Sequence, residues 1–157
     1  MGANQFSFEM NVVGAGEQSI KPNPPFSVET GYYITGLFDN GNYTPAKASE
    51  WFSASITAKD ANGKFLASTD RIGTGTVIRA GNYAYTVVIP CDLNSDGKVD
   101  IADLAIMKRA TLKSYTLSDI QKKACGVTGT DTAPGIVKLA QLKRYILGKN
   151  TNTNLIK

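Results

Sequence analysis

The chain has 157 residues, enough for one average domain or two small ones, and 42% of them are hydrophobic, as in folded proteins. Its formal net charge is +4 and it has no histidine, which removes the usual neutral-pH base and the usual zinc or copper ligand. The Lys and Arg residues are scattered without an aromatic-plus-basic motif, so we expect a solvated basic face and no nucleic-acid partner. No apolar run approaches the length of a membrane span, so we expect no membrane insertion.

The N-terminal half predicts a compact, β-rich domain. Strict alternation of apolar and polar residues from Asn4 to Val13 is the period-2 signature of a half-buried strand. Three prolines in Lys21–Pro25 exclude a central strand. Thr44 followed by Pro45 predicts the start of a short helix over Ala46–Ala54, whose aromatic residues lie against the sheet. Further strands are predicted at 31–38, 56–59, 65–68, 76–79 and 82–89, with hairpin turns at 60–63 and 80–81.

The stretch DLNSDGKVDIAD, residues 92–103, has the spacing of a twelve-residue calcium loop. Gly97 stands at position 6, where such a loop turns sharply. Four carboxylates this close together repel one another without a cation, and calcium prefers six to eight oxygen ligands. The alternative is an acidic surface turn that contains Asp-Gly. The predicted ligands, with Lys98 acting through its carbonyl, are Asp92, Asn94, Asp96, Lys98, Asp100 and Asp103.

Beyond the loop the apolar period changes from 2 to about 3.6, which predicts three helices. The first begins at Ile101. The second begins with the capping-box pattern of 118–121 and ends at Gly126. The third runs from Ile136 to Gly148, and a polar tail follows at 149–157.

The helical part contains a weak internal repeat. Residues 104–109, LAIMKR, match residues 139–144, LAQLKR, with an offset of 35. Projecting the acidic loop through this offset leaves Asp131 as its only carboxylate and puts Lys138 at the closing position. We therefore expect no second calcium site and an ordinary loop at 128–134.

The duplicated loop and helix, with the pattern D-x-N-x-D-G-x-x-D-x-x-D before a Leu-x-x-x-Lys-Arg helix, resembles a dockerin module. Dockerins are the calcium-stabilised plugs of cellulosome enzymes and scaffoldins, which act in polysaccharide degradation. The β-rich part in front is similar to the Ig-like or X modules that precede some dockerins. The resemblance implies an Ig-like/X-type sandwich with one short helix at 4–90, an all-α dockerin of two loop-helix repeats at 91–150 and a flexible tail at 151–157.

The resemblance also implies a non-catalytic function, the calcium-dependent binding of a cohesin on a scaffoldin or cell-surface anchor by a module that is otherwise monomeric. Family contacts fall at loop positions 10 and 11 and helix positions 17 and 18. Packing inside the module is the alternative for the two isoleucines, and a solvated face is the alternative for the Lys-Arg pairs. The corresponding residues are Ile101, Ala102, Lys108 and Arg109 in the first copy and Ile136, Val137, Lys143 and Arg144 in the second.

Apolar residues at positions 10 and 11 depart from the Ser-Thr pair of many clostridial enzyme dockerins, which favours another cohesin specificity. Because both helices keep Lys-Arg, binding in two orientations is possible, although the second loop has lost its ligands.

Cys91 and Cys125 flank the two repeat loops and suggest a disulfide in an exported module, with two buried thiols as the alternative. Closing the 34 positions between them (125 minus 91) would contribute about 3–4 kcal/mol in chain-entropy models. Met1-Gly2 opens directly onto a strand-like stretch without a signal peptide. Since millimolar calcium is found outside cells, we expect an excised piece of a secreted or surface-attached protein.

Two other functional classes remain open at this point. A carbohydrate-binding module would use the aromatic residues as a sugar-stacking platform, whereas their alternating positions favour core packing. An enzyme is the weakest hypothesis, because the sequence has no serine–base or cysteine–base constellation and no carboxylate pair assignable to glycoside hydrolysis. The aromatic set is Tyr32, Tyr33, Tyr43, Trp51, Tyr83 and Tyr85.

Overall fold

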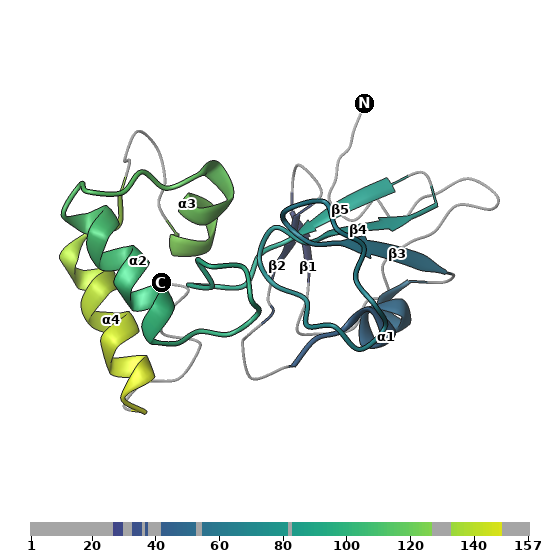
Figure 1. The fold of residues 1–157 in the computed structure, drawn as a ribbon, viewed down its shortest axis with the longest axis horizontal. Coiled ribbons are helices and arrows are strands. Elements are labelled where there is room, and N and C mark those ends of the chain that lie inside the picture. Colours follow the sequence, from purple (N-terminus) through teal and green to yellow (C-terminus); the bar gives the residue numbers. More distant parts are fainter. Residues whose placement is uncertain are drawn as a thin grey trace.

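Figure 1 shows the computed structural model of the chain, in which a small sheet with one short helix lies beside a group of three helices. The structure describes residues 27–29, 33–35, 37, 42–52, 55–81, 83–126 and 133–148. The strand predicted at 4–13, the proline segment 21–25, most of the 128–134 loop and the tail beyond 148 lie outside these residues.

The N-terminal part forms one mixed sheet with the strand order β1-β2-β5-β4-β3. β2 runs parallel to β5, and the other neighbours are antiparallel. The described residues thus form a single sheet, and the two-sheet Ig-like sandwich that the resemblance implied is not seen among them. The strands are β1 (Ser27–Glu29), β2 (Tyr33–Thr35), β3 (Ile56–Lys59), β4 (Val77–Ala80) and β5 (Tyr83–Val87).

The two predicted hairpins have different outcomes. In the β4–β5 hairpin, which is confirmed, Ala80 pairs with Tyr83 and Gly81 has a φ of 58°, as a two-residue turn requires. In the other, Phe65 makes only an isolated bridge with Lys59, on the edge of β3 opposite to β4. The segment after Phe65 therefore forms no second strand.

The predicted helix after Thr44 is confirmed at its start and is shorter than expected. The Thr44 side chain accepts a backbone hydrogen bond of 3.3 Å in the first turn of α1 (Pro45–Ala48), and proline occupies the first helical position. A 3₁₀ turn, η4 (Ser49–Trp51), follows and ends because Phe52 is extended, with φ −122° and ψ 159°. Trp51 and Phe52 are buried, in agreement with their predicted packing against the sheet.

The three predicted helices are confirmed as α2 (Ile101–Thr111), α3 (Asp119–Cys125) and α4 (Ile136–Ile146). The capping box of α3 is formed, and Gly126 ends the helix with a left-handed φ of 69°. α2 and α4 pack against each other, and their bounds differ by the 35 residues of the sequence repeat. In the described part of the chain no helix is long and apolar enough to cross a membrane.

One hydrophobic cluster joins the two parts. It begins in the sheet, passes through the short connection after β5 and continues between the helices. The repeat-related Met107 and Leu142 are fully buried where α2 faces α4. Fully buried members along this path are Ile78, Tyr85, Val87, Ile89, Leu93, Met107 and Leu142, all at most 1% exposed.

Candidate functional site

The first residue of the acidic loop is held at the base of the loop. Asp92 is fully buried. Its Oδ1 accepts a hydrogen bond from the backbone N–H of Asp96 (3.1 Å), and its Oδ2 accepts from Gly97 (3.0 Å). A third backbone donor, Thr74, reaches Oδ2 at 2.7 Å from the N-terminal part of the chain. Asp92 thus sets the curvature of the loop and ties it to the sheet part.

The closing residue, Asp103, joins both ends of the same loop. It is fully buried, and its Oδ1 accepts from the backbone N–H groups of Leu93 (2.7 Å) and Asn94 (3.1 Å). Its Oδ2 accepts from Asp100 (2.9 Å), whose own carboxylate caps α2 by accepting from Ala102 (2.9 Å). This reciprocal capping box makes the end of the loop and the start of the helix one rigid unit.

The remaining predicted side-chain ligands lie on the outer side of the loop. Asn94 and Asp96 are exposed, and the Asn94 side-chain amide donates to Asp96 Oδ2 at 3.0 Å. Asp96 Oδ1 accepts from the backbone N–H of Lys98 at 2.8 Å. Gly97 has a φ of 77°, which confirms the sharp turn predicted at position 6.

Burial makes the two inner carboxylates difficult to ionise. It raises the pKa of Asp92 to about 7, with repulsion by Asp103 adding to the effect. Burial likewise raises the pKa of Asp103 to about 6, although three backbone hydrogen bonds oppose the rise. Neither carboxylate forms an ion pair with the described part of the chain. A cation at this loop would offset both penalties.

The donor chemistry of the loop fits a hard cation such as calcium, since it combines carboxylate, amide and carbonyl oxygens. The structure places all the predicted ligands in one short segment. Among the described residues, no three acidic, histidine or cysteine side chains form a group that could hold a metal. The inner carboxylate oxygens face backbone N–H groups instead.

The predicted partner-binding residues lie on the surface of α2 and α4. Ile101 is 66% exposed and Ile136 is 72% exposed, so the alternative in which they pack inside the module is contradicted. Val137 and Ala102 are exposed beside them, as are the two Lys-Arg pairs. The Arg109 guanidinium lies 5.2 Å from the ring centroid of Tyr115, which limits its freedom.

Two further exposed apolar residues were not predicted. Leu112 and Leu147, which follow the last residues of α2 and α4, are 67% and 60% exposed. They are also separated by 35 positions, so extending the sequence repeat by three residues would have found them. Each helix therefore presents an apolar residue near both of its ends.

Both cysteines are buried free thiols in the structure and do not form the disulfide that the sequence predicted. They belong to neighbouring segments, since the Cys91 N–H donates to the carbonyl of Ala124 at 2.9 Å. Burial raises the pKa of Cys91 to about 12 and also holds the pKa of Cys125 well above its usual value. The two thiols contribute to the hydrophobic cluster as small apolar residues.

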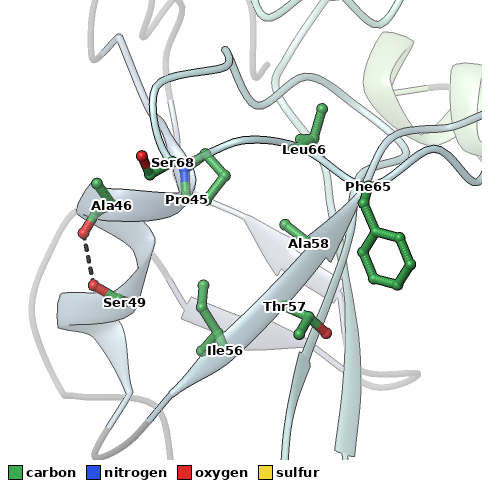
Figure 2. Close-up of a pocket in the computed structure, with 9 residues that line it drawn as sticks. All are labelled: Pro45, Ala46, Ser49, Ile56, Thr57, Ala58, Phe65, Leu66 and Ser68. Atoms are coloured by element: carbon green, nitrogen blue, oxygen red, sulfur yellow. Dashed lines mark hydrogen bonds between the residues drawn. The ribbon is translucent and has the colours of Figure 1, made fainter.

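Among the described residues, the members of the predicted aromatic set do not form an exposed platform. Trp51 and Tyr85 are buried, and the described remainder of the set is half-buried against the core, which confirms core packing. An open cavity of about 360 Å³ lies between α1, β3 and the segment after the 60–63 turn. Figure 2 shows the exposed ring of Phe65 at its edge, away from the aliphatic lining. No charged side chain lines this cavity.

The acidic twelve-residue loop opens α2, and α4, a helix of equal length, stands at the repeat offset of 35 residues. The family model of the Dockerin type I domain matches residues 90–131, which contain the loop, α2 and α3. This match indicates a non-catalytic, cohesin-binding assembly module of cellulosome-type complexes in that part of the chain. No curated protein and no solved structure matches the chain.

Proposed function

We propose that this chain is a calcium-dependent assembly module that binds a cohesin on a scaffoldin or cell-surface anchoring protein outside the cell. The observation that carries the proposal is the repeat-related exposure of Ile101 and Ile136 at the starts of two packed helices. Exposed apolar residues grouped on packed elements are typical of protein–protein contact sites.

Calcium binding is the second component of the proposal. Asp92, Asn94, Asp96 and Asp103 would supply side-chain oxygens, Lys98 its carbonyl, and Asp100 the position that often acts through a water. The ion supplies positive charge to a loop whose buried carboxylates have no cationic partner in the described part of the chain. The capping box of Asp100 and Asp103 would then transmit the order of the loop to α2.

The basic residues give this surface its charge preference. Lys108, Arg109, Lys143 and Arg144 are exposed on the same helices as the apolar residues. Lys and Arg at the edge of an apolar contact favour an acidic partner surface and accelerate association. Because both helices carry this combination, a cohesin could engage either copy; the loss of loop ligands from the second copy is the feature that would make the first copy the stronger site.

The experiment that tests the proposal is a pull-down of the whole chain against a panel of cohesins, with calcium and with a chelator. We expect retention by at least one cohesin in calcium and loss of retention in the chelator. Affinity gels of plant polysaccharides serve as the comparison. Retention by polysaccharide and by none of the cohesins would contradict the proposal and support a carbohydrate-binding module.

A further inference from the structure

A segment of the N-terminal part, Arg71–Gly75, lies directly against the acidic loop, and we name it the buttress segment. A Cβ on Gly73 would lie 2.1 Å from the carbonyl oxygen of Ser95. A Cβ on Gly97 would lie 2.4 Å from the carbonyl oxygen of Ile72. The two backbones thus touch where both carry glycine, and neither glycine has room for a side chain.

Hydrogen bonds connect the same two segments. Arg71 Nε donates to the carbonyl of Gly97 at 2.8 Å. The Thr74 N–H donates to Asp92 Oδ2 at 2.7 Å, so that one of the donors to the first loop carboxylate comes from outside the loop. The buried Thr74 hydroxyl also bonds both the carbonyl (3.1 Å) and the N–H (3.0 Å) of Ile89, just before the loop.

The buttress segment is equally attached to the interior of the sheet part. The N–H of Ile72 donates to the carbonyl of Tyr43 at 2.8 Å. The Tyr43 ring meets Trp51 edge-on, with 5.8 Å between the ring centroids. Trp51 is 8% exposed and is the single tryptophan of the sequence. A short path of direct contacts therefore runs from the acidic loop to one natural fluorophore.

We propose that the buttress segment is a structural component of the metal loop, so that calcium binding and the folding of the N-terminal part form one cooperative process. The inference rests on the proposed calcium binding. A ligand that binds only the folded form stabilises every element that must be folded to create its site. The buttress segment donates a hydrogen bond to Asp92 and packs against Gly97. The N-terminal part is therefore among the elements that must be folded to create the site.

The test follows the urea unfolding of the full chain by Trp51 fluorescence and by helical circular dichroism, in calcium and in a chelator. Trp51 reports the N-terminal part, and the dichroism reports mainly α2, α3 and α4. We expect the two midpoints to coincide and to rise together in calcium. A calcium-dependent rise of the dichroism midpoint alone would overturn the coupling and leave the proposed function intact. Absence of both a shift and a calcium binding heat would instead refute the calcium site.

Two arginines offer a matched pair of variants. Arg71→Ala removes the bond to the Gly97 carbonyl together with a hydrogen bond to the Asn42 side chain. Arg79→Ala removes an exposed arginine of β4, whose strand partners Thr57 and Ala84 lie outside the buttress segment. We expect Arg71→Ala to weaken calcium binding in calorimetric titration about five- to tenfold, the equivalent of one hydrogen bond, and Arg79→Ala to leave it unchanged. Equal calcium affinities of the two variants would overturn the proposed role.

Discussion

Asp92 and Asp103 are the residues at which the folding of the loop and the burial of negative charge oppose each other. Both are fully buried, and each accepts three backbone hydrogen bonds, so they organise the loop. Burial of the two negative charges in one small region nevertheless penalises their ionised forms. Without a cation, the fold must carry this penalty or keep the carboxylates protonated.

This opposition predicts an unusual pH dependence of the calcium-free protein. Burial raises the pKa of Asp92 to about 7 and that of Asp103 to about 6, whereas an unfolded aspartate titrates near pH ~3.9. The folded form therefore binds these protons more tightly, and the associated stability is lost as the pH rises through about 6 to 7. We expect a lower free energy of unfolding at about pH 8 than at about pH 5 in a chelator, measured by urea denaturation. Equal values at the two pH values would contradict the prediction.

Saturating calcium provides the control for that experiment. In the proposed site the ion would bind the ionised carboxylates, so it should raise the free energy of unfolding more at the higher pH. The pH dependence seen in the chelator should then become smaller or disappear.

Variants of Gly97 and Gly148 separate two energetic costs, that of the close backbone contact at the loop and that of a left-handed φ. Both have a left-handed φ, 77° and 73°, but only Gly97 lacks space for a Cβ. We expect Gly148→Ala to lower the free energy of unfolding by about 1 kcal/mol, the cost of a left-handed alanine. Gly97→Ala should cost several kcal/mol, because the Ile72 carbonyl must also move. Equal losses in denaturant titration would show that the contact with Ile72 relaxes freely.

At the residue scale, the sequence located the loop and its turn but not the support behind it. Oxygen-bearing side chains at fixed positions produce a spacing that can be read directly, and Gly97 completes it. Thr74 lies 18 positions before Asp92 and contributes a backbone N–H, which any residue except proline possesses. No side-chain pattern could have revealed that contact.

At the scale of elements, α2 and α4 each have one face that packs inside the molecule and another that remains exposed. Their buried faces meet each other, and the apolar residues near their ends remain exposed. The exposed residues can therefore be altered without affecting the core.

The partner surface is tested by Ile101→Ser, Ile136→Ser and the double variant. Because both side chains are mostly exposed, we expect little change in the unfolding midpoint. In a binding titration with a retained cohesin, the double variant should lose at least about tenfold in affinity, as expected for apolar anchors. A large effect of only one single variant would indicate one binding orientation; unchanged affinity of the double variant would contradict the surface.

Leu142→Ala is the contrasting variant, since Leu142 is fully buried between the helices. It should lower the free energy of unfolding by about 2–5 kcal/mol. Comparing it with the isoleucine variants separates loss of the fold from loss of the contact surface.

α3 is connected to the acidic loop through Gln121. The Gln121 side-chain oxygen accepts from the Ser118 N–H at 2.9 Å, and its nitrogen donates to the Leu93 carbonyl at 2.8 Å. Gln121→Glu keeps the acceptor and removes the donor, so it places a carboxylate against a carbonyl. We expect a loss of about 1–3 kcal/mol in the free energy of unfolding, measured by urea titration.

Ser118→Ala is the matched control, because it removes the cap of α3 without touching Leu93. It should cost about 1 kcal/mol. If Gln121→Glu were as stable as the unaltered protein, the bond from Gln121 to Leu93 would contribute nothing to stability.

The helices were predictable because their ends are encoded locally, whereas the sheet was not. Ser118, Gly126 and Gly148 mark helix ends in the sequence and in the structure alike. β1 has three residues, too few to show a period, and the parallel pairing of β2 with β5 joins residues about 50 positions apart. Phe65 follows a strong turn signal yet pairs with Lys59 at one bridge only, on the edge of β3 that β4 leaves open.

At the scale of the whole molecule, the reactivity of the two cysteines shows whether the segment after β5 remains packed against α3. Both thiols are buried and their pKa values are raised by burial, so the reactive thiolate is scarce. We expect the folded protein to react very slowly with a thiol reagent and the unreduced, unfolded protein to reveal two thiols. Recovery of no thiols after unfolding would establish the disulfide that the sequence predicted.

The sequence predicts two parts with a boundary near residue 90, and the described residues form a sheet before that point and three helices after it. It could not indicate that they share an interior, because the contacts of Arg71, Gly73 and Thr74 with the loop join residues far apart in the chain. Composition changes along a chain identify units of similar pattern, and these need not be units that fold alone.

The position of the buttress segment has a practical consequence for protein engineering. The family match begins at residue 90, which invites a cut at that point to obtain a portable affinity tag. Such a fragment would lose the Thr74 amide and the backbone packed against Gly97. A transplantable cassette from this chain should therefore start upstream of β1 and carry the small sheet with it.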